Sequence, residues 1–249
     1  MSLAAEATLN RTLSPHEQMD FSGLEHYFRV GRSALDVVLD GLRAAGRTEV
    51  GPTPYGVKTI LDLPCGQGRV LRYLRMAFPD AEITACDMSR DGVDFCAETF
   101  GAVPVYSCDD PEQVPLPRDH YDLTWVGSLL THLEGPKWER FLRVFHSVMS
   151  PGGILIFTTH GARAHSFMAG RKFHYGHQEP ALAELTAAYD RDGFGYVQYE
   201  GSAWQYGTSV ARRDWVLDRI NAVPGLTLVK HVEHGWDNHQ DCFVCRRDA

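Results

Sequence analysis

The feature that most constrains this chain is a regular alternation of short apolar runs and amphipathic segments between residues 57 and 160. Strands are predicted at 57–64, 81–87, 103–107, 121–127 and 152–160, and helices at 68–78, 89–101 and 135–150. Strands that alternate with helices form a parallel sheet with helices on its faces. The alternation therefore predicts a doubly wound α/β fold.

The rest of the chain adds to both ends of this sheet. An amphipathic helix at 31–45 is expected to act as a lid within an N-terminal segment, 1–50, attached to a main domain, 51–249. Residues 161–208 form an insert with weak periodicity, which is followed by a helix at 209–221 and a hairpin of strands at 225–235 and 239–247. The complete prediction is a seven-stranded, mostly parallel sheet with an antiparallel C-terminal hairpin.

Charge and composition limit the partners. The 249 residues have a formal net charge of -8, which disfavours a nucleic-acid or anionic-membrane surface. No run approaches the roughly 18 apolar residues of a membrane helix, and the first residues lack the features of a secretory signal. A cytoplasmic location with no nucleic-acid and no membrane partner is expected; the sequence makes no prediction of oligomeric state.

The cysteines predict neither disulfides nor a metal site. Six occur in the chain, several of them inside apolar runs where cysteine packs as a small hydrophobe. Cys242 and Cys245 form a CxxC near two histidines, but the surrounding residues alternate as in a strand, and side chains three residues apart on a strand point to opposite faces. Two buried strand cysteines are the expectation.

The corner after the first predicted strand holds the strongest functional signal. In the sequence Asp62-Leu-Pro-Cys65-Gly66-Gln-Gly68, two glycines lie at the carboxyl edge of the sheet, where open parallel sheets bind ligands. The third glycine of a dinucleotide fingerprint is absent, so pyrophosphate binding is poorly supported.

Acidic residues follow the next two strands at the same edge. Asp87 ends the second strand, 19 residues after Gly68, at the position where a carboxylate accepts hydrogen bonds from ribose hydroxyls. Asp109 and Asp110 follow the third strand, and either could accept from an adenine amino group. Together these acids favour a ligand that contains adenosine.

The segments "ILDLPCGQGR", "ITACDMS", "CDDPEQVPLPRDHYDLTWVGSLLTHL" and "MSPGGILIFTTHG" resemble the class I S-adenosylmethionine-dependent methyltransferases over about residues 57 to 160. The resemblance implies S-adenosylmethionine as cofactor, S-adenosylhomocysteine as product and a small-molecule methyl acceptor. It also implies which residues contact each part of the cofactor. Asp62, Cys65, Gly66 and Gly68 would border the methionine end, and Asp87 would bind the ribose. Met88 would lie on the adenine face, Asp109 would bind the adenine amine, and Ser128 would lie near the sulfonium. Pro64 stands where the family's first loop glycine is common, which removes one backbone donor.

Further candidates come from histidines and from the N-terminal segment. Methyl transfer needs a general base only where the acceptor must lose a proton, and His132 and His160, both just beyond strand ends, are the candidates. His132 could instead cap a helix or line the site. Tyr27 could close over the methionine end of the cofactor, or could pack on the core as part of a helix lead-in.

The insert is rich in aromatic and histidine side chains that suit an acceptor pocket for a polar ring. The alternative is that they attach the insert to the domain. They are His165, His174, Tyr175, His177, Tyr189, Tyr196, Tyr199, Trp204 and Tyr206.

The preferred function is O- or N-methylation of a small molecule. Three alternatives are a non-catalytic protein that binds the cofactor as a sensor or partner subunit, a nucleotide-dependent oxidoreductase, which the missing third glycine disfavours, and a nucleic-acid methyltransferase, which the net charge disfavours.

Overall fold

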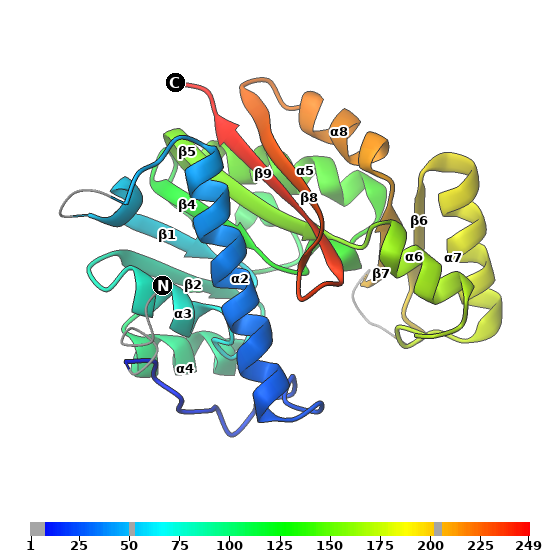
Figure 1. Ribbon diagram of the computed structural model, residues 1–249, viewed down its shortest axis with the longest axis horizontal. Coiled ribbons are helices and arrows are strands. Elements are labelled where there is room, and N and C mark those ends of the chain that lie inside the picture. Colours follow the sequence, from blue (N-terminus) through cyan, green and yellow to red (C-terminus); the bar gives the residue numbers. More distant parts are fainter. Residues whose placement is uncertain (1–7, 50–52, 202–205) are drawn as a thin grey trace.

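The main sheet contains the seven strands that the sequence predicts. The computed structural model describes residues 8–49, 53–201 and 206–249. Seven strands lie in the order β3-β2-β1-β4-β5-β9-β8 (Figure 1). They are β1 (Thr59–Asp62), β2 (Glu82–Asp87), β3 (Val103–Tyr106), β4 (Tyr121–Val126), β5 (Met149–Thr159), β8 (Leu226–Trp236) and β9 (Gln240–Arg247). β1 to β5 pair in parallel, and β9 pairs antiparallel with both β5 and β8, which confirms the predicted fold.

Helices cover both faces of this sheet. α2 (Leu24–Ala44), α3 (Leu71–Ala77) and α4 (Arg90–Phe100) pack on one face in a core that includes Ile60 of β1. α5 (Gly135–Val148) and α8 (Arg213–Asn221) pack on the other face, where the next residue of β1, Leu61, is buried. Consecutive strand residues point to opposite faces, so a strand buried on both sides must be apolar throughout.

Both ends of α4 and the turn between β8 and β9 are formed by residues that favour such positions. The Ser89 side chain caps α4 by accepting from the backbone N–H of Gly92, and Gly101 ends the helix in the left-handed conformation with φ 65°. The Asp237-Asn238 pair forms the tight turn between β8 and β9, with φ 49° and 52°.

The N-terminal helix differs from its prediction. α2 begins at Leu24 rather than Gly31, so Tyr27 lies inside the helix. Its apolar stripe packs against β5 and β8 as a layer of the domain rather than across the ligand edge (Figure 1). The physical reason is that residues such as Leu35 and Val38 are fully buried and could not remain on a mobile cover. The predicted boundary between residues 50 and 51 lies outside the described residues.

The insert has more regular structure than its sequence indicates. It contains α6 (Ala162–Ala169), α7 (Glu179–Asp192) and the separate two-stranded sheet of β6 (Phe194–Gln198) and β7 (Gly207–Ala211). These elements project beyond the end of the main sheet (Figure 1). Trp204 lies outside the described residues.

Two further observations concern the cysteines and the helices. Cys242 belongs to the core under α2 and Cys245 to the core under α5, which confirms that their side chains point to opposite faces of β9. Within the described ranges no helix is long and apolar enough to cross a membrane.

Candidate active site

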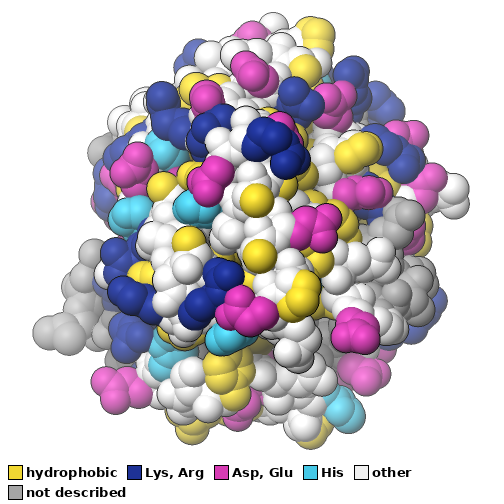
Figure 2. All heavy atoms as spheres, turned by 90° about the vertical axis from the view of Figure 1, so that its right-hand side faces the viewer, with side chains coloured by type: hydrophobic (Ala, Val, Ile, Leu, Met, Phe, Trp, Pro, Cys, Tyr) yellow, Lys and Arg dark blue, Asp and Glu magenta, His cyan; other side chains and the backbone are white. Residues whose placement is uncertain are grey.

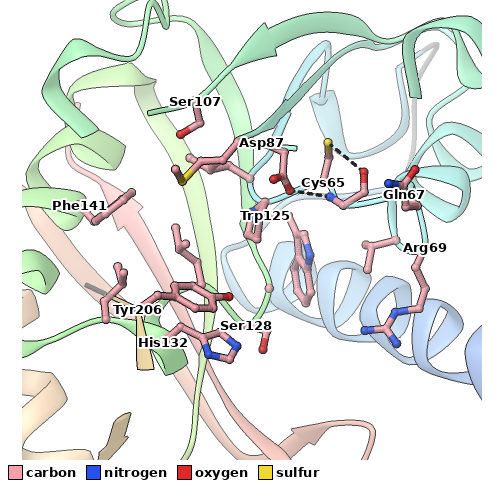
Figure 3. Close-up of a pocket in the computed structure, with 18 of the residues that line it drawn as sticks. Cys65, Gln67, Arg69, Asp87, Ser107, Trp125, Ser128, His132, Phe141 and Tyr206 are labelled. Carbon is pink, nitrogen blue, oxygen red and sulfur yellow. Dashed lines mark hydrogen bonds between the residues drawn. The ribbon is translucent and has the colours of Figure 1, made fainter. Parts of the chain in front are cut away.

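A cavity of about 470 Å³ opens at the carboxyl ends of β1, β2 and β4. Most of the predicted cofactor residues line it: Cys65, Gly66, Asp87, Met88, Asp109 and Ser128, together with His132. Figure 3 shows Gln67 and Arg69 at one side of the cavity, Ser107 and Phe141 at the other, and His132 beside Tyr206. A cavity of this size suits a ligand as large as a nucleoside derivative.

The glycine corner is shaped for close approach of a ligand. Gly66 has φ 50°, and a Cβ built on it meets no atom within 4 Å, so a side chain there would extend into open space beside the cavity. Gly68, with φ 77°, has a different role because its Cβ would come within 2.6 Å of the Phe100 ring. Gly68 therefore lets the corner pack against α4, whereas Gly66 borders the cavity.

Asp87 holds the corner and retains acceptor capacity. Its Oδ2 accepts from the backbone N–H of Gly66 at 2.8 Å, and its Oδ1 accepts from the N–H of Ser89 at 2.8 Å. Each carboxylate oxygen can accept a second hydrogen bond. Asp87 can therefore fix the loop and still accept from a ligand hydroxyl.

Asp62 lies behind the corner rather than on the cavity wall. It is 1% exposed, and neither carboxylate oxygen has a hydrogen-bond partner among the described residues. Burial, and secondarily the nearby Asp87, raise its pKa well above the usual range. An unpaired buried carboxyl favours a positively charged group in the neighbouring space.

The two aspartates after β3 have different surroundings. Asp109 lines the cavity, and its Oδ1 accepts from Nζ of Lys137 at 2.7 Å, which leaves Oδ2 available to a ligand. Asp110 instead caps the short helix η2 (Pro111–Gln113) and pairs with Arg140. Asp109 is thus the one of the pair with a free acceptor at the cavity.

Ser128 is held in an unusual conformation at the end of β4. Its φ is 61°, a left-handed value for a residue with a side chain. Its N–H donates to Oγ1 of Thr158 at 2.8 Å, its Oγ accepts from Gln240 at 3.0 Å, and its carbonyl accepts from Thr131 at 2.7 Å. This network determines the backbone direction where β4 meets the cavity.

His132 presents a basic nitrogen at the cavity. Its Nδ1 is 2.8 Å from the carbonyl oxygen of Gly207, and since a carbonyl only accepts, Nδ1 carries the proton of the neutral ring. The lone pair is then on Nε2, which has no hydrogen-bond partner in the described part of the chain. Burial lowers the pKa of His132, opposed by the bond to Gly207. The Tyr206 ring stacks on it at a centroid distance of 4.5 Å.

His160 and Tyr27 do not reach the cavity. His160 is 5% exposed, its Nδ1 bonds the carbonyl of Ser209 at 3.1 Å, and burial lowers its pKa to about 3. Tyr27 is a fully buried residue of α2, and its hydroxyl accepts from Arg72 at 3.2 Å. Burial, with Glu17 close by, raises the pKa of Tyr27 and keeps the phenol protonated. The predicted roles of His160 as a general base and of Tyr27 at the methionine end therefore do not fit this geometry.

Several cavity residues have no signal in the sequence alone. Trp125 and Trp236 line one side, and their rings are 5.5 Å apart at 86°, but in the sequence Trp125 is one more apolar residue of a predicted strand and Trp236 falls between the two strands of the predicted hairpin. Glu17, Arg69 and Lys137 are charged residues whose neighbours come from other parts of the chain. Among them, only Arg69 adjoins a motif, directly after Gly68, and could have been singled out.

The residues present fit S-adenosylmethionine. Asp87 and Asp109 offer acceptors for a ribose and an amino group, and the orphaned Asp62 carboxyl and Gly66 meet at the corner where its amino-acid end would lie. The surplus of carboxylates suits a cationic sulfonium better than a pyrophosphate. Within the described ranges no group of three histidine, cysteine or acidic residues is placed to hold a metal ion.

Comparison with known proteins agrees with this fit. Residues 60–153 match the methyltransferase domain family. Over these residues the match confirms the resemblance to the class I S-adenosylmethionine-dependent methyltransferases. The matched segment contains the glycine corner, Asp87, Asp109, Ser128 and His132.

The curated relatives that match part of the chain include two O-methyltransferases. The chain is 28% identical over 102 residues to a fatty-acid O-methyltransferase of Mycolicibacterium smegmatis, which covers 41% of this chain and 36% of that protein. It is 31% identical over 112 residues to a malonyl-[acyl-carrier protein] O-methyltransferase of Laribacter hongkongensis. This alignment covers 41% of this chain and 37% of that protein. The chain thus matches less than half the length of these relatives.

Solved structures share the methyltransferase fold at low identity. A geranyl diphosphate methyltransferase in complex with S-adenosylmethionine has a TM-score of 0.54 and 13% identity, and covers 87% of this chain and 85% of its own. The [4+2]-cyclase SpnF has a TM-score of 0.51 and 17% identity, and covers 86% of this chain and 82% of its own. One fold therefore carries different reactions.

Proposed function

We propose that this protein transfers a methyl group from S-adenosylmethionine to an oxygen or nitrogen atom of a small molecule. The observation that carries the proposal is the cavity at the carboxyl edge of β1, β2 and β4, which combines free acceptors on Asp87 and Asp109 with the unprotonated Nε2 of His132. The cofactor supplies a methyl group already activated by its sulfonium. The protein must then align the acceptor and exclude water.

His132 is proposed to remove the proton of the acceptor. The hydrogen bond from Nδ1 to Gly207 keeps Nε2 unprotonated, and the stacked Tyr206 ring restricts rotation of the imidazole. A lowered pKa keeps the ring neutral at pH 7, the state that a base requires. Ser128, held by Thr158 and Gln240, would fix the wall of the cavity beside it.

A small-molecule acceptor is supported by the surroundings of the cavity. His132 stacks on Tyr206, and His177 stacks on Tyr199 at a centroid distance of 4.9 Å, so uncharged rings gather on the side of the insert. Figure 2, which faces the end formed by the insert, shows acidic and basic side chains interspersed. A nucleic-acid backbone would instead require a continuous basic surface.

The O-methyltransferase relatives favour oxygen over nitrogen as the acceptor atom. They act on fatty acids and on malonyl-[acyl-carrier protein], and carboxylic acids are ionised at pH 7 without help from a base. A base at the cavity instead suits a hydroxyl or a protonated amine. The two classes of acceptor therefore differ in whether turnover needs His132.

The first experiment is calorimetric titration with S-adenosylmethionine and S-adenosylhomocysteine, with NAD as the control ligand. Micromolar binding of the sulfonium pair without NAD supports the proposal. Absence of binding by folded, ligand-free protein contradicts it, and binding of NAD alone would indicate an oxidoreductase.

Turnover is measured next, as release of S-adenosylhomocysteine with phenols, amines and fatty acids as acceptors. Cofactor affinity with no turnover on any acceptor would indicate a sensor or partner subunit.

A further inference from the structure

Tyr206, whose ring covers the proposed base, brings a polar atom of its own to the cavity. The Tyr206 ring stacks on the His132 ring at a centroid distance of 4.5 Å and an angle of 18°. The residue lines the cavity, and Figure 3 shows its hydroxyl turned into the cavity. This hydroxyl has no hydrogen-bond partner among the residues that the structure describes. It is therefore available to a ligand beside His132.

The hydroxyl of Tyr206 lies on the inner side of the residue. The residue as a whole is 40% exposed. Burial nevertheless raises the pKa of its phenol, and the nearby Tyr199 and Asp87 raise it further. The exposed part of Tyr206 is therefore its outer side, whereas the hydroxyl is shielded from solvent within the cavity. The phenol stays protonated at neutral pH and can donate a hydrogen bond.

The insert holds Tyr206 in a fixed position relative to His132. The carbonyl of the next residue, Gly207, accepts from Nδ1 of His132 at 2.8 Å. Further along β7, Oγ of Ser209 donates at 2.7 Å to the carbonyl of Leu130, which begins the short helix that ends at His132. β7 and this helix are thus joined at two points, and the stack of the two rings adds a third.

A hydroxyl group can use both polar atoms at once. Its proton goes to the unprotonated Nε2 of His132, and one lone pair of its oxygen accepts from the Tyr206 hydroxyl. The second lone pair remains free to form the bond to the methyl group. A neutral amine has a single lone pair, which the new bond requires, so it cannot accept from Tyr206. An ionised carboxylate has no proton to give to His132.

We propose that Tyr206 and His132 together bind the hydroxyl group of the methyl acceptor, so that the protein methylates the oxygen of an alcohol or a phenol. This inference rests on the proposed function and names its acceptor group. In the transfer, the O–H bond breaks and its proton goes to Nε2 of His132. The oxygen forms the new bond to the methyl group, and the electron pair of the broken S–CH₃ bond stays on sulfur. The positive charge thus passes from the sulfonium to the imidazolium, and the hydrogen bond from Tyr206 stabilises the negative charge that develops on the oxygen.

Acceptors that are matched in shape test this assignment. The pairs are phenol with aniline, 1-naphthol with 1-naphthylamine and cyclohexanol with cyclohexylamine, and benzoate is the carboxylate. Release of S-adenosylhomocysteine gives kcat/KM, which wild-type protein should favour at least about tenfold for the hydroxyl member of a pair. Tyr206→Phe keeps the stacked ring and removes only the donor. It should lower kcat/KM for the hydroxyl acceptors about 10- to 100-fold and leave the Kd for S-adenosylmethionine unchanged.

The control is Tyr106→Phe, which removes the hydroxyl of a tyrosine of β3 that is 37% exposed and does not line the cavity, and it should change neither quantity. A preference for amines or for benzoate would overturn the assignment, as would an unchanged kcat/KM in Tyr206→Phe. A weaker Kd for S-adenosylmethionine with unchanged acceptor preference would place Tyr206 at the cofactor and overturn it as well. Wild-type protein that binds S-adenosylmethionine but methylates no acceptor would contradict the proposed function itself.

Discussion

Removal of the Asp87 carboxylate gives the sharpest test of the cofactor site. In Asp87→Ala, the backbone N–H groups of Gly66 and Ser89 each lose an acceptor at 2.8 Å. The Ser89 donor is exposed and can bond to water, whereas the Gly66 donor is partly buried, so the loss at Gly66 dominates. We expect the free energy of unfolding to fall by about 1 to 3 kcal/mol, the cost of one unsatisfied donor.

The effect on the cofactor adds to the effect on the corner. A ribose hydroxyl that donates to a carboxylate contributes about 1.5 to 3 kcal/mol, so the affinity for S-adenosylmethionine should fall about 10- to 150-fold. Urea unfolding measures the first effect, and calorimetric titration of the folded variant measures the second. Asp218→Ala, an exposed aspartate of α8, is the control and should change neither. Unchanged affinity in folded Asp87→Ala would refute the ribose assignment.

Three further predictions concern the glycines and the histidines. Gly66→Ala should lower stability by about 1 to 2 kcal/mol because of its φ of 50°, and it should also weaken cofactor binding. Gly68→Ala should lower stability further because its Cβ would lie 2.6 Å from Phe100. Urea unfolding measures stability and calorimetry measures cofactor affinity, and a larger loss of stability in Gly66→Ala than in Gly68→Ala would contradict the packing. His132→Gln should lower kcat about 10²- to 10⁴-fold and leave the Kd for S-adenosylmethionine unchanged. Because the base must be neutral and the pKa of His132 is lowered from 6.5, wild-type kcat/KM should fall only below about pH 6.5. An unaltered kcat in the variant would exclude a base at this position. Burial lowers the pKa of His160 to about 3 in the folded protein, against about 6.5 in the unfolded chain, so the unfolded state binds the extra proton and stability falls as the pH drops below 6.5. In urea unfolding, His160→Asn should remove about 1 kcal/mol of the stability lost between pH 6.5 and 5.5. Parallel plots of stability against pH for the wild type and the variant would count against this origin.

The central strands were predictable because they are buried on both faces. β1, β2 and β4 are buried over most of their length, and the helix caps Ser89 and Gly101 mark the ends of α4, which follows β2. β3, at the edge of the sheet, is mostly exposed. The insert was not predictable in the same way. β7 is buried along its whole length although it consists of Gly, Thr, Ser, Val and Ala, because the helices of the insert and residue Leu130 cover it. That burial depends on distant residues rather than on a local pattern.

The site shows the same division. Gly66, Asp87, Asp109 and His132 were predicted from their places after strands, and Cys65, Met88 and Ser128 from the resemblance to the family. All of them line one cavity. His160 also follows a strand, but β7 covers it, and its Nδ1 bonds Ser209 instead. A position after a strand indicates the edge of the sheet, and the covering elements determine whether a side chain there is accessible.

The sequence by itself determined the α/β fold, the ligand edge and the acids at that edge, because strand periodicity, glycine conformation and the parallel direction of the strands are local properties that act in chain order. Tertiary structure alone decided which of the candidates face the cavity and which charges remain unpaired. Arg69 and Arg72 are the same residue type and lie three residues apart, just before and within α3. Arg72 donates to the carbonyl groups of Asn10 and Thr12, whereas Arg69 lines the cavity. The difference arises from contacts about 60 residues apart in the chain, and such contacts exist only after the N-terminal segment has packed against α3.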